Sequence, residues 1–244
     1  MEWSLGVNWH RPICDPVAEG ERAWTWIEAL KPLHPALALW RPTADTIQLA
    51  REAPPMTRDV LLHRIRTRQQ QKQHPLGFMI IPAFCGQLGA GSKLALDFGY
   101  PEPGDGGLTL WIGRELGDAL DADEALADAI MTTSATILHP TIAALSSRKH
   151  PPRNTAVNGP APYNYSAGWK MFFPTASPHW QRAHQLATRT RPVADGAILT
   201  YGDKTKLMVE GGRWNMNNAS LSISGRNKLG GRRASDYTSK HYGI

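Results

Sequence analysis

The sequence predicts an α+β fold: a single domain in which a mostly antiparallel sheet packs against several helices. Three observations carry this prediction. Apolar residues recur at helical spacing in two stretches, short strand-like runs lie between them, and the two kinds of element follow one another in irregular order. A regular strand–helix alternation would instead predict a parallel sheet. The apolar content, 41% of 244 residues with nine tryptophans, is enough for a sizeable core.

The chain begins with a predicted strand and a predicted helix. Residues 3–12 have the pattern of a short strand or an extended arm that ends at Pro12. Asp15 is suited to cap a helix and Pro16 to occupy its first position, and apolar residues then recur at helical spacing. We therefore expect a helix over residues 16–30.

The middle of the chain predicts both kinds of element. Residues 33–40 suggest a short helical turn, and residues 58–72 an amphipathic helix with a basic outer face. Three strands are expected at 76–84, 93–98 and 108–112.

Residues 118–138 give the clearest helical pattern. Leu126, Ile130 and Ile137 lie on one face, acidic residues gather in the first turns, where the helix dipole favours them, and His139 with Pro140 ends the helix. The elements expected after it are a surface loop over 146–164, a strand over 169–173, a short helix over 178–186, and a hairpin that pairs 197–200 with 207–209. We expect one folded domain over residues 1–220 and a basic, irregular tail over 221–244.

Charge is unevenly distributed. The net charge is +6, and basic residues concentrate at 58–72 and after residue 203. One acidic stretch has no base among its acids and exceeds what helix capping requires, so we predict that it binds a basic protein partner. Its members are Glu115, Asp118, Asp121, Asp123, Glu124 and Asp128.

Motifs of catalysis are weak in this sequence. Residues 86–93 resemble a phosphate-binding loop, but Ser92 precedes Lys93 where the motif needs the reverse, and a strand is expected to follow instead of a helix. Ser166 resembles a nucleophile elbow without its first glycine. No histidine or cysteine spacing of metal-site type occurs. We therefore expect no enzyme activity, no cofactor and no metal.

The two cysteines and the hydropathy pattern bear on location. Cys14 and Cys85 do not form a disulfide framework, although one bridge stays possible. No signal-peptide pattern and no apolar run of membrane-spanning length is found. We expect a cytoplasmic protein that makes no contact with a membrane.

An ordered series of small motifs resembles a known family. Leu5-Gly6 with Trp9 and Arg11 is followed by a helix, then Leu37 with Trp40, then Phe84-Cys85-Gly86, then Gly168-Trp169 at the head of a strand. This series resembles the immunity protein 52 family of bacterial polymorphic-toxin systems. The basic segment at 58–72 and the basic tail are not part of the family pattern. The signature positions carried over are Trp9, Arg11, Trp40, Gly168 and Trp169.

The resemblance implies an α+β protein that binds and neutralises a cognate secreted toxin, often a restriction-endonuclease-like nuclease delivered by type VI secretion. Neutralisation would be by occlusion, without catalysis, and the signature residues would be core anchors. One alternative is a basic nucleic-acid-binding protein that uses Arg64, Arg66, Arg68 and residues 226–233, a reading that the scarcity of nearby aromatic residues disfavours. Another is an unrecognised hydrolase built around Ser166.

Overall fold

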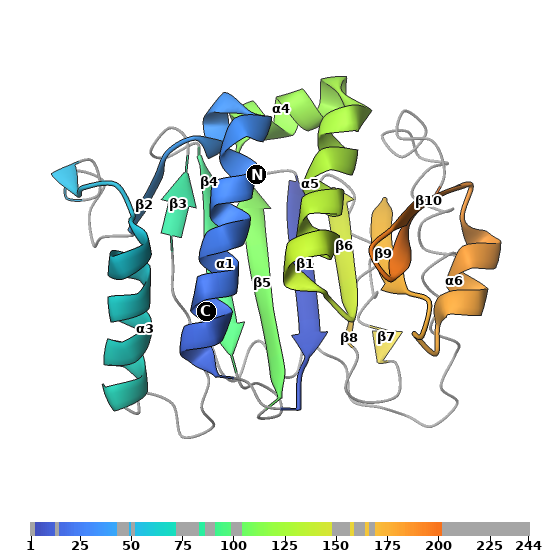
Figure 1. Cartoon of the computed structure of the whole chain (residues 1–244). Helices are drawn as coiled ribbons and strands as arrows, with labels where there is room; N and C mark the ends of the chain where they lie inside the picture. The colour runs from blue at the N-terminus through green and yellow to red at the C-terminus, as the bar shows by residue number, and fades with distance from the viewer. Residues whose placement is uncertain are drawn as a thin grey trace.

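The computed structural model describes residues 3–12, 15–42, 49, 52–71, 83–85, 91–98, 104–147, 157–158, 164–165 and 169–201. In this part of the chain an antiparallel sheet of nine strands is covered by helices, so the α+β prediction is confirmed. Figure 1 shows α3 (Arg58–Gln71), α1 (Pro16–Leu30) and α5 (Glu124–Leu138) side by side across one face of the sheet. None of the helices in these segments combines the length and the apolar content that a bilayer crossing requires.

The N-terminal strand lies at the centre of the sheet. The strands are β1 (Trp3–His10), β2 (Trp40–Pro42), β3 (Ala83–Cys85), β4 (Ser92–Phe98), β5 (Asp105–Ile112), β6 (Ile142–Ser147), β9 (Lys170–Pro174), β10 (Arg189–Val193) and β11 (Gly196–Thr200). Their order is β10-β11-β9-β6-β1-β5-β4-β3-β2. A separate pair joins β7 (Val157–Asn158) to β8 (Asn164–Tyr165).

Alternation along β1 fixes which face of the sheet is buried. Trp3, Leu5, Val7 and Trp9 point toward the helices and are almost fully buried, whereas the residues between them are partly or fully exposed. This two-residue period is what a strand packed on one face requires. The same core takes apolar residues from β4, β5 and β6, so the sheet and its helical layer share one interior.

The helical layer lies against that face. Its helices are α1 (Pro16–Leu30), α3 (Arg58–Gln71), α4 (Arg114–Ala122) and α5 (Glu124–Leu138), with short 3-10 turns at Lys31–Leu33 and Pro35–Leu37. The predicted start of α1 is confirmed, because the Asp15 carboxylate accepts a hydrogen bond from the backbone N–H of Val17 at 3.1 Å and Pro16 opens the helix.

A second, smaller core lies on the other face of the sheet at the β9–β11 end. There α6 (Trp180–Leu186) covers the side chains of β9 and β11 that point away from α5. The Tyr201 hydroxyl donates a hydrogen bond to the Ala183 carbonyl at 3.1 Å and so fixes α6 to the end of β11. The buried members are Ile142, Met171, Phe173, Ala183, Ala197, Leu199 and Tyr201.

Two predicted elements differ from the structure. The single helix expected over 118–138 is two helices, because Asp123 is extended and its carboxylate caps α5 by accepting from the Ala125 N–H at 2.8 Å. The expected hairpin is also wrong, because strand 196–200 pairs with Arg189–Val193 on one edge and with Lys170–Pro174 on the other. Residues 207–209 lie outside the described residues. His139, with a left-handed φ of 43°, ends α5 as predicted.

The remaining predicted elements agree in part. Strand β6 occupies the start of the segment expected to be a loop, and most of the strand expected over 76–84 lies outside the described residues, as does the basic tail. Strands β4, β5 and β9 and helix α6 occur where the sequence places them, with small shifts at their ends.

Candidate functional site

The six acidic residues predicted to bind a partner gather where α4 ends and α5 begins. Glu115, Asp118 and Asp121 lie on α4, Asp123 is the residue between the helices, and Glu124 and Asp128 lie in the first two turns of α5. On the opposite side of α4, Leu116 and Leu120 are buried in the core. The acidic residues therefore lie on α4 and the start of α5, the elements at the top of Figure 1.

Part of this region is exposed and has little compensating charge among the described contacts. Glu115 and Asp123 are exposed, and the Asp118 side chain is 70% exposed. Asp118 pairs with Arg114 at 3.9 Å, and because Arg114 is itself 86% exposed, a pair so solvated contributes little. We call Glu115, Asp118 and Asp123 the α4 acidic surface.

Asp121 has a structural role instead. Its carboxylate accepts a hydrogen bond from the indole N–H of Trp3 at 3.0 Å. Because Trp3 is buried in the sheet core, this bond gives its polar atom a partner and ties the end of α4 to β1.

Glu124 and Asp128 have basic partners, so the prediction that the acidic stretch lacks compensating charge is wrong for these two. The buried ammonium of Lys170 on β9 lies 2.8 Å from Glu124 Oε1 and 2.5 Å from Asp128 Oδ1. Arg189 also pairs with Glu124, and Arg191 lies 3.6 Å from Asp128. All three bases come from later in the chain, where a local charge count does not detect them.

The pKa of Glu124 reflects these partners. Burial by itself raises the pKa, because it disfavours the charged carboxylate. Hydrogen bonds and the positive charges of Lys170 and Arg189 outweigh that effect and hold the pKa of Glu124 below its ordinary value. The carboxylate is therefore ionised at neutral pH, and it pairs with Lys170 and Arg189 within the protein.

The signature tryptophans lie in the interior. Trp9, Trp40 and Trp169 are each no more than 2% exposed. The Trp40 indole N–H donates to the Leu37 carbonyl at 2.8 Å, and Trp169 lies against Trp3 with ring centroids 5.7 Å apart. Such positions suit packing more than contact with a partner. Gly168 lies outside the described residues.

Arg11 joins three elements at one end of the sheet. Its guanidinium pairs with the buried Glu19 of α1 at 2.6 Å, donates to the Leu138 carbonyl at the end of α5 at 2.8 Å, and lies over the Trp9 ring. Arg22 approaches the same carboxylate at 3.5 Å. This signature residue therefore connects β1 to α1 and α5.

The basic residues proposed to bind nucleic acid in the alternative reading differ in their exposure. On α3, Arg66 is exposed and Arg64 is half-buried, whereas Arg58 pairs with Glu21. The side chain of Arg68 and residues 226–233 lie outside the description.

Neither the phosphate-binding-loop motif at 86–93 nor the nucleophile-elbow motif at Ser166 is followed by the helix that it requires. Strand β4 begins within the glycine-rich segment at 86–93, where a phosphate-binding loop would need a helix. Strand β9 follows Ser166, where a nucleophile elbow would also need a helix, and Ser166 itself is not among the described residues. Within the described ranges no three or more His, Cys, Asp or Glu side chains are grouped to hold a metal ion.

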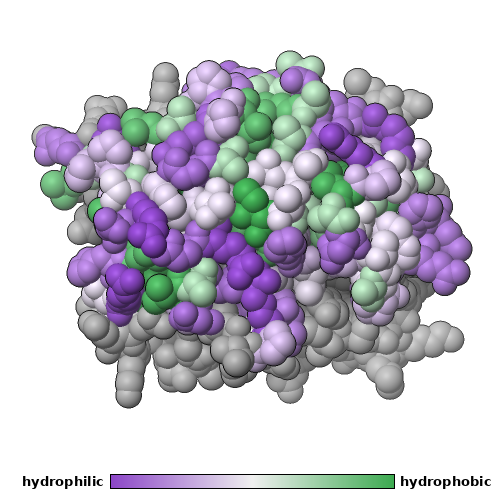
Figure 2. Space-filling model, in the orientation of Figure 1, coloured by the Kyte–Doolittle hydropathy of each residue, from purple (hydrophilic) through white to green (hydrophobic). Residues whose placement is uncertain are grey.

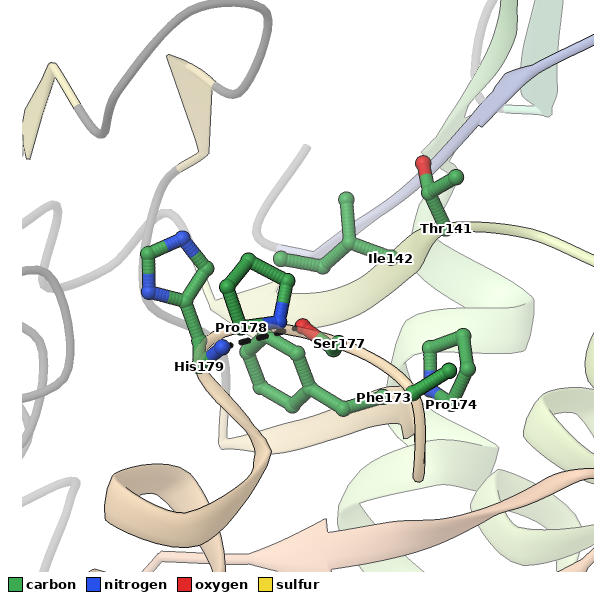
Figure 3. Close-up of a pocket in the computed structure, with 8 residues that line it drawn as sticks. Thr141, Ile142, Phe173, Pro174, Ser177, Pro178 and His179 are labelled. Atoms are coloured by element: carbon green, nitrogen blue, oxygen red, sulfur yellow. Dashed lines mark hydrogen bonds between the residues drawn. The ribbon is translucent and has the colours of Figure 1, made fainter.

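A small pocket of about 150 Å³ opens where β6 begins and β9 ends. Figure 3 shows Ile142 and Phe173 together with Pro174 and Pro178 around it, and the backbone N–H of His179 donates to the Ser177 hydroxyl at 3.2 Å. Small-molecule sites usually measure roughly 300–1,000 Å³. This pocket therefore has room for about one apolar ring or side chain.

Figure 2 shows the helix-bearing face as a mixture in which hydrophobic residues form separate small patches between hydrophilic ones. Large apolar interfaces need contiguous patches. Recognition through this face would accordingly depend on charge.

Comparisons with known proteins find little. No family model matches the chain, and no curated protein matches it. Among solved structures the chain is similar to one described as "Pseudomonas aeruginosa T6SS protein PA0821", with 12% sequence identity and a TM-score of 0.47, over 95% of this chain and 78% of that chain. Similarity of this extent does not bear on function.

Proposed function

We propose that this chain is an immunity protein that binds a cognate antibacterial toxin and neutralises it by occlusion, without catalysis of its own. The observation that carries the proposal is the α4 acidic surface, where Glu115, Asp118 and Asp123 are exposed. The resemblance of the tryptophan-anchored motifs to the immunity protein 52 family supports it. The toxin is a nuclease delivered by type VI secretion, and the two proteins meet in the cytoplasm.

Charge explains why a nuclease fits this surface. An enzyme that cleaves nucleic acid needs positive charge in its cleft to hold phosphates. An opposed acidic surface attracts that cleft over a distance of about a Debye length and speeds association, and a bound protein then keeps the phosphate backbone out. The chain as a whole is basic, with a net charge of +6, so only a local acidic surface can supply this attraction.

The partner can be identified by purifying the tagged protein from the bacterium that makes it. We expect one nuclease-like protein in near-equal amount, and its nuclease activity should fall as purified immunity protein is added. Recovery of nucleic acid with no protein partner would contradict the proposal and favour the nucleic-acid alternative.

Reversing charge on the α4 acidic surface should slow binding. The variant Glu115→Lys/Asp118→Lys should reduce the association rate constant for the toxin by about 10-fold or more at low salt, because electrostatic steering accounts for rate gains of that order. Asp123 is left intact because it caps α5. Surface plasmon resonance at two salt concentrations gives the rates, and the variant should also be less sensitive to salt.

A matched control separates the local surface from total charge. The variant Asp59→Lys/Asp195→Lys changes net charge equally at exposed positions on α3 and on the β10–β11 turn. We expect its association rate to stay within about threefold of the wild type. Equal slowing by the two variants would show that the α4 acidic surface is not the binding site.

A further inference from the structure

Residues 169–201 form a compact unit within the sheet. This unit contains β9, α6, β10 and β11. The small core between α6 and the sheet holds most of its apolar side chains together with Ile142 of β6, and on the other face Trp169, Phe172 and Ile198 belong to the main core. In the described part of the chain its one strand-to-strand connection to the remaining sheet is the pairing of β9 with β6 over Ala143–Leu145. By comparison, β1 pairs with β5 along its whole length. The connection to the central sheet is therefore short.

A cluster of charges spans the same junction. Lys170 is 1% exposed and faces α5, and its ammonium contacts Glu124, Asp128 and the Thr200 hydroxyl, the last at 3.2 Å. It also lies 4.7 Å from the centre of the Trp169 ring. Thr200 is directly opposite Lys170 on β11, so the cluster joins the first two turns of α5 to two strands of the unit.

The outer members of the cluster are more exposed. Arg189 and Arg191 on β10 have side chains 60% and 57% exposed, and each pairs with one of the same carboxylates. Solvated pairs of this kind contribute little to stability. The apolar part of the junction is the packing of Trp169, Phe172 and Ile198 in the main core. Its charged part depends on the pairing of the buried Lys170, because a buried charge that loses its partner is strongly destabilising.

We propose that residues 169–201 open as a unit while the central sheet stays folded, and that the Lys170 ion cluster is the latch that keeps the unit closed. The latch depends on charge. It holds while both carboxylates are ionised and fails when either is neutralised, because the ammonium is then left in the interior without full compensation.

The direction of the pH effect follows from Glu124. Its pKa is lower in the folded protein than its ordinary value of 4.5, so its contribution to closure is complete at pH values above 4.5 and is lost as pH falls through the folded pKa. The charged groups around Lys170 are Glu124 and Asp128 on α5 and Arg189 and Arg191 on β10. Because protonation removes the negative charge of Glu124 that faces Lys170, opening is expected on the acid side.

Hydrogen exchange of the intact chain tests the latch residue by residue. In the variant Asp128→Asn at neutral pH, we expect protection factors in β9 and β11 to fall by about 10-fold or more while those in β1 and β5 stay unchanged. In the wild type the same selective loss should begin only below pH 4.5, as pH falls through the folded pKa of Glu124. Equal loss of protection in all four strands would show that the sheet opens as one cooperative unit and would overturn the proposal. An unchanged protection in β9 and β11, in the variant and in acid, would overturn it as well.

A neutral cluster provides the matched control. The variant Lys170→Met/Glu124→Gln/Asp128→Asn leaves no buried charge, and replacement of a complete buried ion pair is often neutral or stabilising. We expect protection in β9 and β11 to return to within about threefold of the wild type and to lose its selective dependence on pH. A triple variant that opens in acid as the wild type does would show that other groups control the unit.

Discussion

The variant Trp26→Ala is expected to lower the free energy of unfolding by about 3–5 kcal/mol. Trp26 on α1 is fully buried, lies against Trp40 with ring centroids 6.5 Å apart, and donates its indole N–H to the Ser134 hydroxyl of α5 at 3.0 Å. Ser134 also donates to the Ile130 carbonyl, so truncation does not leave it without a partner. The loss should come from the cavity, and urea denaturation with an unchanged m-value would measure it.

Trp24 provides a control on the same helix. It is only partly buried and lies under the ammonium of Lys31, 5.1 Å from its ring centre. Because surrounding water can fill much of the space of a truncated, partly buried ring, Trp24→Ala should cost about 1 kcal/mol. A loss equal to that of Trp26→Ala would mean that tryptophan removal weakens α1 itself, and the explanation through the buried cavity would then be wrong.

The variant Gly196→Ala is expected to cost about 2–3 kcal/mol, because β9 lies too close to accept a methyl group. A Cβ atom at Gly196 would lie 2.0 Å from the carbonyl oxygen of Phe173 and 2.7 Å from its carbonyl carbon. Both are backbone atoms of the paired strand, so the two strands have to separate. Thermal unfolding by circular dichroism would detect the loss as a lower midpoint.

Gly6 is the matching site without the obstruction. It lies on β1, and a Cβ atom there would meet nothing within 4 Å. Alanine is favoured over glycine inside a strand by roughly 0.5–1 kcal/mol, so Gly6→Ala should be neutral or slightly stabilising. Since both substitutions change strand propensity equally, their difference isolates the steric effect. Similar losses of stability for Gly6→Ala and Gly196→Ala would contradict the steric explanation.

Elements with local signals were predictable from sequence. The start of α1 follows from the capping chemistry of Asp15 and Pro16, and β1 and β5 follow from apolar runs of strand type. The break between α4 and α5 was missed because the alanine-rich sequence on either side of Asp123 favours helix throughout. One carboxylate that bonds to the backbone two residues later was enough to divide it.

Elements that depend on distant partners could not be predicted. Strand β10 has the sequence Arg-Thr-Arg-Pro-Val, and its first four residues are exposed, so no apolar alternation marks it. Its pairing depends on β11, across a turn in which Ala194 has a φ of 49°, a conformation that alanine rarely adopts. The partners of Glu124 and Asp128 likewise come from β9 and β10. For the candidate site, the sequence names the six acids, but only the structure separates the exposed ones from those in the ion cluster.

The central position of β1 constrains how the chain acquires its structure during synthesis. Trp3 pairs with Ile112 on one side and with Ser147 on the other, so the earliest strand must wait for partners made much later. At about 5–20 residues per second, the ribosome needs several seconds to supply them. During that interval the alternating tryptophans of β1 have no sheet to enter. Folding should therefore be slow for the size of the chain, and a chaperone that shields an apolar N-terminal segment should raise the yield.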